Sequence, residues 1–570
     1  MVNCHKLLFD YRDTVIILLT PVILSPLLFS VDYESEYKCA YVVVLMAIYW
    51  VFEVLPLAIT ALIPMVLFPC LGIMKSDKVA KMYLPDTGFL FIGGLMVAVA
   101  VEKSNLHTRI ALAVLAIVGS DPKFIMLGFM GVTAFLSMWI SNTATAALMV
   151  PIVQSVITEL VSNHRAGELS GLMEKSNLAS RRRSLEGRRL SMTTDPTTMI
   201  REQPKDMCKY FSPRELRMSK GLLISVCYAA NIGGAATITG TASNLVFVGQ
   251  LEKLFPGADT GINFLSWIVF AAPMCAMCLV CCWLILCVIF LRGCPKGNAA
   301  VSRKLKEKYD RLPNISFAEK MVTICFSFLL FLWVMREPKV VPGVGSLFKK
   351  GYVTDATSAV LVVIILFILP EKWPNFHVHR RAGERHKGLL DWSSIQDNFP
   401  WAVVILLGGG FALAAGESDL SQMIGDMMKT LGSLPNFFAM SICVLITVAL
   451  TNICSNTVVA SIFTPIVAEL ARSLEINPLM FMLPVTVGSS FAFLLPVATP
   501  PNAIVFGAGA IAGFLVTLCC TVVNIANMWI MAVPLLALNE FPEWAYTNEQ
   551  IAGNATSLIV EMFNATFIRN

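Results

Sequence analysis

The chain has 570 residues, of which 56% are hydrophobic and only 14% are charged, and its formal net charge is +5. With a mean hydropathy of +0.70, this composition excludes a soluble enzyme and indicates an all-α polytopic membrane protein. The small positive charge lies in connecting segments, which argues against nucleic-acid binding.

Apolar runs that could cross a bilayer recur along the chain. We expect about eleven transmembrane helices, in the runs 14–31, 39–54, 57–71, 89–101, 221–249, 264–291, 322–334, 360–369, 401–415, 480–508 and 511–538. Two further runs, 124–160 and 437–470, would overshoot a hydrocarbon core of roughly 30 Å as single helices. We therefore predict that each is a re-entrant hairpin of two half-length helices, which starts and ends on one side of the membrane.

The centre of each predicted hairpin carries the same polar triplet. Residues 141–143 and 455–457 both read Ser-Asn-Thr, and the thirteen-residue windows SNTATAALMVPIV and SNTVVASIFTPIV share seven identities. At nearly the same offset, PDTGFLFIGG (85–94) matches PWAVVILLGG (400–409). Because a polar triplet in an apolar run is costly unless protein or a cavity surrounds it, the pair indicates a function.

A second polar break follows each triplet. Residues 241–244 read TASN and residues 499–502 read TPPN, so Gly-Gly, SNT and TxxN occur twice in the same order. An odd number of predicted spans between the two hairpins inverts the second copy relative to the first. Inverted repeats with paired hairpins are typical of secondary transporters.

Charge in the loops predicts the orientation. The segment 163–220 holds thirteen Lys or Arg against seven Asp or Glu, and 292–320 and 371–387 are also basic. The positive-inside rule places these segments and the N-terminus in the cytoplasm, and the C-terminus outside. We expect 163–220 to be a flexible loop because it lacks a periodic apolar pattern.

This orientation predicts which of the modification motifs are accessible to the modifying enzymes. The sequons at Asn554 and Asn564 lie in the predicted external tail and are expected to be glycosylated, whereas Asn314 faces the cytoplasm and should remain unmodified. Ser184 and Ser191 follow basic residues and are candidate phosphorylation sites, although an unmodified solvated loop is the simpler interpretation.

The sequence argues against a metal centre and against catalysis. The chain has sixteen Cys, and the CxxC spacings within MCAMCLVCCWLILCVIF are interpreted as accidental because that run is apolar and the chain has only six His. A hydrolase would need a nucleophile and a base, and the apolar runs contain no His. We therefore expect no enzyme, no cofactor and no metal other than sodium.

The chemistry of a hairpin tip suits an ion-coupled anion site. The helix that begins there offers free N–H groups to an anion, and the helix that ends there offers carbonyls to a cation. An Asn amide can serve both ions. Two cation sites around one anion site are therefore expected at mid-membrane. The alternative is that the polar residues are only helix caps and packing contacts, but the matched pair favours a functional role.

With these residues, the chain resembles the divalent-anion:sodium symporters, solute carrier family 13, over nearly its whole length. The motifs that carry the resemblance are MWISNTATAALMVPI, IGGAATITGTASN, LLGGGFALAAG, CSNTVVASIFTPI and FAFLLPVATPPNAIVF. The resemblance implies a homodimer in the plasma membrane that works as an inverted-repeat elevator. It also implies sodium-driven uptake of succinate-like dicarboxylates, citrate or sulfate, with membrane lipid as the surroundings.

The resemblance also implies a division of the chain. We expect scaffold helices in 1–84, transport elements of the first repeat in 85–262, scaffold helices in 263–399, transport elements of the second repeat in 400–510, and a last helix with an extracellular tail in 511–570.

Carried onto matching positions, the family's sites fall on the two triplets and the two breaks. The first sodium site would use Ser141, Asn142 and the backbone of Gly240, with Thr241 nearby; the second would use Asn456 and the backbone of Ala498, with Thr457 nearby. The substrate would be held by Asn142, Thr143, Asn456, Thr457, Thr499 and Pro500.

The motifs identify the family more firmly than they identify which anion is transported. The second triplet is complete, as in the high-affinity dicarboxylate branch, whereas the citrate and sulfate branches resemble SNV and SNP there. The first break departs from the expected GTAPN because Ser243 replaces Pro, and sulfate carriers also lack that Pro. A dicarboxylate is favoured over citrate and sulfate.

A sodium-independent exchanger and an anion channel remain as alternatives, and the channel is disfavoured because an open pore does not need matched inverted ion sites.

Overall fold

A computed structural model describes most of the apolar runs. The described residues are 11–29, 34–117, 121–158, 160–161, 212–256, 258–292, 303, 306–307, 309–336, 343–349, 352–373, 388–414, 434–494, 499, 501–502, 510–528, 530 and 542–545. Within them the secondary structure is helical, apart from one isolated bridge between Pro370 and Gly388.

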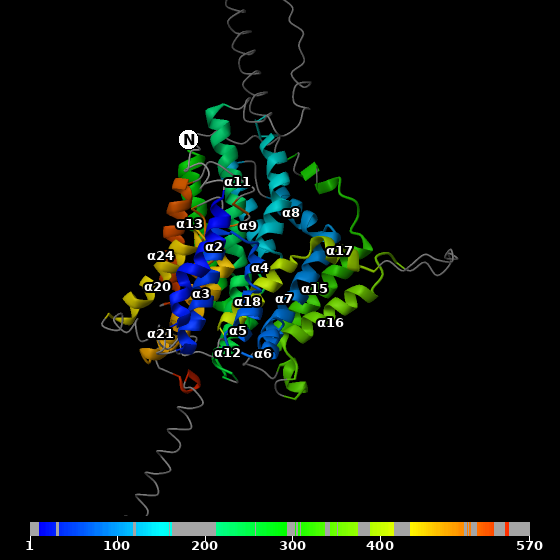
Figure 1. Cartoon of the computed structure of the whole chain (residues 1–570). Helices are drawn as coiled ribbons and strands as arrows, with labels where there is room; N and C mark the ends of the chain where they lie inside the picture. The colour runs from blue at the N-terminus through cyan, green and yellow to red at the C-terminus, as the bar shows by residue number, and fades with distance from the viewer. Residues whose placement is uncertain are drawn as a thin grey trace, which may run out of the picture.

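The helices form a bundle in which several elements run roughly along one common direction (Figure 1). In chain order they are α2 (Arg12–Leu24), α3 (Glu34–Phe52), α4 (Leu57–Thr60), α5 (Ile63–Cys70), α6 (Ser76–Met82), α7 (Asp86–Lys103), α8 (Leu106–Ile117), α9 (Pro122–Ser137), α11 (Pro213–Gly234), α12 (Ala242–Leu254), α13 (Phe264–Phe290), α15 (Phe317–Met335), α16 (Asp355–Ile368), α17 (Trp392–Asn398), α18 (Trp401–Ala414), α20 (Asn436–Thr451), α21 (Asn456–Ser473), α22 (Leu479–Gly488) and α24 (Ala510–Asn527). A further apolar helix, Asn142–Thr158, lies between α9 and α11 in the sequence.

Several of these helices suit a bilayer. In the described part of the chain, four helical stretches are long and apolar enough to cross a membrane: Arg12–Phe29, Ser76–Lys103, Phe264–Phe290 and Phe317–Met335. The shorter apolar helices include both halves of each predicted hairpin. Length and composition therefore agree with a multi-pass membrane protein.

Both predicted hairpins are broken at their polar triplets, as expected. In the first, α9 ends at Ser137 and the next helix begins at Asn142. In the second, α20 ends at Thr451 and α21 begins at Asn456. The helix break at each triplet is thus confirmed.

The predicted second breaks are also present. The run 221–249 divides into α11 and α12, with Ala235 to Thr241 between them. In the second repeat α22 ends at Gly488, and Pro501 and Asn502 are again helical.

Other boundaries differ from the prediction. Helix α11 begins at Pro213, inside the segment 163–220 that was expected to be a loop. The reason is local: Ser212 and Glu215 form a capping box, and Pro213 occupies the first helical position, where its missing N–H costs nothing. Residues 162–211 of that segment lie outside the described residues.

Three helices were not expected at all: α6, α8 and α17. Helix α8 follows α7 directly, because Asn105 adopts a left-handed φ of 57° that turns the chain. Helix α17 starts where the Asp391 side chain accepts a hydrogen bond from the N–H of Ser394. Helix α3 begins at Glu34, earlier than the start of the predicted run 39–54.

The buried apolar side chains form two clusters. The smaller consists of residues from α3, α5 and α6 and their connections, together with Leu406, Ala412 and Val458 of α18 and α21. The larger cluster contains residues from most of the later helices, including both broken pairs, whereas α2 and α4 pack against the smaller cluster. The N-terminal helices therefore form a body of their own that packs against the second repeat.

The two broken pairs open toward opposite ends of the molecule. At one end α9 begins next to α13, where Trp283 Nε1 donates to the Lys123 carbonyl at 2.9 Å. At the other end α21 finishes next to α12, where Arg472 donates to the Leu254 carbonyl at 3.4 Å. Figure 1 shows the same separation, with α12 and α21 at the bottom and the start of α11 at the top.

Ion pairs fix the segment that joins α7 to α8. Arg109 Nε lies 2.9 Å from Glu319 Oε1 at the start of α15, and both side chains are largely buried. Lys103 binds Asp391 at the start of α17. Hydrogen bonds from Lys103, Ser393 and Ser394 hold the pKa of the Asp391 carboxyl well below its usual range. The pairs connect the first repeat to α15 and α17, which both precede the second repeat in the chain.

Close contact between α9 and α11 depends on one glycine. A Cβ on Gly233 would lie 2.3 Å from the Ala134 carbonyl oxygen, whereas a Cβ on Gly131 would meet no atom within 4 Å. We expect Gly233→Ala to separate the two helices and lower the melting temperature of the purified protein, because overpacking costs about 1–3 kcal/mol. Gly131→Ala is the matched control and should be neutral or slightly stabilising. Equal melting temperatures for the two variants would contradict this packing.

Candidate functional site

The first tip gathers oxygen atoms from three segments. Ser137 is the last residue of α9, and its Oγ lies 2.8 Å from Asn142 Oδ1 and 2.7 Å from the Ala230 carbonyl of α11. The hydroxyl has one proton and can donate it to the carbonyl. The two side-chain oxygens would then both be free to face a cation.

The second tip repeats this arrangement. Thr451 is the last residue of α20, and its Oγ1 lies 2.8 Å from Asn456 Oδ1. The same hydroxyl donates to the Ser489 carbonyl, just beyond α22. In both repeats the hydroxyl precedes the Asn by five residues and reaches a carbonyl of the neighbouring broken helix.

The second breaks are held in shape by the Asn of each TxxN. Asn244 Nδ2 donates to the carbonyls of Ala235 at 3.2 Å and Thr237 at 2.8 Å. Asn502 Nδ2 donates to the Ala492 carbonyl at 2.7 Å. These bonds supply donors to backbone carbonyls at the helix breaks, and buried backbone requires such partners.

The first tip packs directly against the first break. A Cβ on Gly234 would lie 2.2 Å from Asn142 Oδ1, and a Cβ on Gly240 would lie 2.4 Å from the Gly234 carbonyl oxygen. The Thr237 hydroxyl also donates to the Met138 carbonyl at the tip. The structure thus brings Asn142 and Gly240, two of the predicted sodium ligands, to one place.

A polar chain joins the two repeats. Asn142 Nδ2 donates to Asn231 Oδ1 at 3.3 Å, and Asn231 Nδ2 donates to Thr499 Oγ1 at 3.2 Å. Asn231 has no exposed surface and Thr499 is 5% exposed. The predicted substrate residues Asn142 and Thr499 are therefore linked through one buried amide.

The remaining predicted residues have different surroundings. Ser141 Oγ accepts a hydrogen bond from the Ala144 N–H and so caps its own helix. Thr143 is exposed, whereas Thr457 is buried in the first turn of α21. Thr241 precedes α12 without a side-chain capping bond. The predicted residues Ala498, Pro500, Asn554, Asn564, Ser184 and Ser191 lie outside the described residues.

Sequence reasoning missed three side chains of this site. Ser137 and Thr451 were not singled out, although they share the offset of 314 that relates Asn142 to Asn456. A search for hydroxyls at matching positions of the repeat would have found them. Asn231 has no counterpart of its own type in the second repeat, and no sequence signal distinguished it.

The site contains neutral oxygens and an open helix end. Its donors are amides, hydroxyls and carbonyls, which are the ligands that hard cations accept. Among the described residues no group of three His, Cys, Asp or Glu could hold a metal ion. Ser455 precedes α21 without making a side-chain capping bond, so the first N–H groups of α21 can accept an anion.

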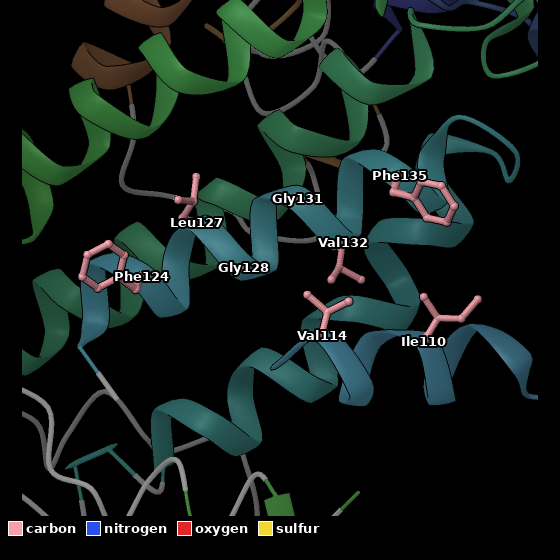
Figure 2. Close-up of a pocket in the computed structure, with 8 residues that line it drawn as sticks. All are labelled: Ile110, Val114, Phe124, Leu127, Gly128, Gly131, Val132 and Phe135. Atoms are coloured by element: carbon pink, nitrogen blue, oxygen red, sulfur yellow. The ribbon is translucent and has the colours of Figure 1, made fainter. Parts of the chain in front are cut away.

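An apolar recess elsewhere on the molecule does not suit an anion. It has a volume of about 440 Å³ between α8 and α9 and is lined by Ile110, Val114, Phe124, Leu127, Gly128, Gly131, Val132 and Phe135. Figure 2 shows Ile110, Val114 and Val132 turned toward the space between the two helices, and none of the eight lining residues has a polar side chain. The polar tips are thus the candidate anion site.

Comparison with known proteins is consistent with this geometry. Residues 6–538 match the family described as the sodium:sulfate symporter transmembrane region. The chain is 58% identical to the sodium-dependent low-affinity dicarboxylate transporter 1 of Caenorhabditis elegans, over 95% of this chain and 94% of the relative. It is 46% identical to the sodium-dependent high-affinity dicarboxylate transporter 3 of the same organism, over 94% and 89%. It is 39% identical to the Na(+)/citrate cotransporter of Rattus norvegicus, over 96% and 99%.

Proposed function

The chain belongs to the sodium:sulfate symporter family, and from this membership we propose that it is a sodium-coupled symporter that imports succinate-like dicarboxylates. Its similarity to sodium-dependent dicarboxylate and citrate transporters over more than nine-tenths of its length supports this substrate class. The chain is a transporter and not an enzyme, and sodium is its coupling ion.

One observation carries the proposal. At each tip the oxygen of an Asn lies 2.8 Å from a hydroxyl oxygen five residues earlier, and that hydroxyl has a backbone carbonyl as an alternative acceptor. Two matched clusters of neutral oxygens suit two monovalent cations. Ser137 and Thr451 accordingly join Asn142 and Asn456 as proposed sodium ligands.

The anion would lie between the two cations. Bound sodium supplies positive charge, and the uncapped start of α21 supplies N–H groups. The proposed substrate residues remain Asn142, Thr143, Asn456, Thr457, Thr499 and Pro500. No charged side chain is needed, because the carboxylates would be neutralised by the cations that accompany them.

The departure at Ser243 does not change the backbone. Ser243 is the second residue of α12 and has no exposed surface. Proline is tolerated in the first turn of a helix, so Ser and Pro can occupy this position with the same helical geometry. Ser243 is therefore compatible with the dicarboxylate assignment.

The finer mechanism is part of the same proposal. We infer an elevator in which two inverted, re-entrant hairpins move with the substrate, within a homodimer of the plasma membrane with a cytoplasmic N-terminus and an extracellular C-terminus. The approach of the broken pairs from opposite ends supports inversion. The N-terminal helices have a cluster of their own that meets the second repeat at Leu406, Ala412 and Val458, which supports a scaffold in contact with the moving part.

Uptake by cells that express the protein tests the proposed function. We expect accumulation of labelled succinate with external sodium and not with choline, and its loss in Asn456→Ala, which removes the amide of the second tip. Citrate and sulfate are measured in parallel. Uptake of sulfate alone would preserve the sodium mechanism and refute the dicarboxylate assignment, and uptake that is indifferent to sodium would refute the coupling.

The two tip hydroxyls provide a second prediction. Ser137→Ala and Thr451→Ala should each raise the sodium concentration for half-maximal uptake about tenfold, since loss of one hydrogen-bonding ligand costs ~1.4 kcal/mol. Thr451→Ser keeps the hydroxyl and should remain close to wild type.

Thr447→Ala is the matched control for these hydroxyl variants. Thr447 is a buried Thr one turn earlier on α20 whose hydroxyl donates to the Cys443 carbonyl, and its loss should leave sodium dependence unchanged. If Thr447→Ala and Thr451→Ala shifted sodium dependence alike, the hydroxyls would have no role as ligands.

A further inference from the structure

Helix α21 has a proline in its interior, and the carbonyl that would normally bond to that position is bound by a side chain of the other repeat. Pro465 has no N–H, so it cannot donate to the carbonyl of Ser461 four residues earlier. Gln250 of α12 supplies the donor, and its Nε2 lies 2.9 Å from the Ser461 carbonyl oxygen. Gln250 has no exposed surface. A residue of the first repeat therefore completes the hydrogen bonding of a helix of the second.

The two helices that this bond joins each begin at a predicted ion site. Helix α12 begins at Ala242, two residues after Gly240, and α21 begins at Asn456. At 1.5 Å per residue, Gln250 lies about 12 Å from the start of α12, and Ser461 lies about 8 Å from the start of α21. A displacement at the start of either helix is thus transmitted to the other over a short length of regular helix.

Further contacts make α12 and α21 a stiff pair. Near the end of α21, Arg472 donates to the Leu254 carbonyl at 3.4 Å, and its guanidinium carbon lies 5.0 Å from the centre of the Phe255 ring. Within α21 the Ser461 hydroxyl donates to the Thr457 carbonyl at 2.8 Å. The buried bond between the helices therefore reaches the first turn of α21 through a single residue.

The corresponding position of the first hairpin has different surroundings. Pro151 matches Pro465 at the offset of 314, and the residue four positions before it is Ala147. Ala147 is exposed, whereas Ser461 is 1% exposed. A proline in a hairpin helix therefore does not by itself dictate a buried partner from the other repeat. The bond to Gln250 is a separate feature of the second hairpin.

We propose that Gln250 is a positioning residue that couples the first sodium site to the second tip by fixing α12 to α21. Sodium at the first break restrains the start of α12, and the bond from Gln250 passes that restraint to the start of α21. Such coupling is a difference in binding free energy and acts equally in both directions. The dependence of succinate binding on sodium therefore requires Gln250. The inference rests on the proposed sodium-coupled transport of dicarboxylates.

Removing the bond tests this role. Gln250→Met keeps the length of the side chain and removes its donor. We expect the fall in the KM for succinate between low and saturating sodium to become about fivefold smaller than in the wild type. The Hill coefficient for sodium should fall toward unity, while the maximal rate at saturating sodium and succinate stays close to that of the wild type. Uptake of labelled succinate over a series of sodium concentrations measures all three quantities.

Pro465→Ala distinguishes positioning from a merely structural role. It restores an N–H at residue 465, which can donate to the Ser461 carbonyl without Gln250. In this background Gln250→Met should lower the melting temperature less than it does alone, because no buried carbonyl loses its donor. The loss of sodium coupling should persist, because the bond between α12 and α21 is still missing. Recovery of both stability and coupling would overturn the positioning role.

Asn527→Leu is the matched control. Asn527 has no exposed surface, and its Nδ2 donates to the Phe270 carbonyl at 3.2 Å. The variant breaks an equally buried bond between α24 and α13, two helices that contain none of the predicted site residues. It should lower the melting temperature and leave the sodium dependence of the KM for succinate unchanged. An equal loss of coupling in Asn527→Leu and Gln250→Met would contradict the inference.

Binding to the purified protein gives a readout that does not depend on transport. Succinate should raise the melting temperature of the wild type at a lower concentration in sodium than in choline. In Gln250→Met the ratio of these two concentrations should be about fivefold smaller. If Gln250→Met does not fold, the double variant with Pro465→Ala provides the same measurement.

The outcomes separate this inference from the proposed function. Absence of sodium-dependent succinate uptake in the wild type would refute the proposed function. A functional wild type in which Gln250→Met keeps both the Hill coefficient for sodium and the sodium dependence of the KM for succinate would refute the coupling role and leave the proposed function intact.

Discussion

The structure depends on one constraint, which is that a polar group inside a bilayer needs a partner within the protein. Each helix break takes backbone carbonyls out of the helical hydrogen-bond pattern, and a nearby side chain binds them. Asn244 and Asn502 donate hydrogen bonds to the carbonyls of their own breaks. The breaks can therefore persist at membrane depth without closing into continuous helices. The oxygen atoms that remain at the tips are then available to an ion.

Close packing brings these oxygens together. Gly233 and Gly234 let α9 and the Asn142 amide approach the backbone of α11, where any side chain would collide. Ser137 can then reach the Ala230 carbonyl. The tip geometry is thus a consequence of the close helix packing that these two glycines allow.

The sequence identified the helix breaks correctly because polar triplets in apolar runs have few structural explanations. It did not reveal α8, whose polar start resembles a loop, or the first turn of α11, which follows from a capping box rather than from apolar periodicity. Ser137, Thr451 and Asn231 were missed for another reason. A single hydroxyl or amide within a helix has no local signal, and its role appears only when a neighbouring helix places an acceptor beside it.

An internal duplication supplies two similar backbones, but it does not require that both do the same work. The tips share a hydroxyl, an amide and a carbonyl, which is what a cation needs from each. They differ where an anion would be bound, in the side chain next to the shared carbonyl and in the cap of the following helix. A duplicated fold can therefore keep the same arrangement of oxygens at both tips while the neighbouring side chains and helix caps diverge.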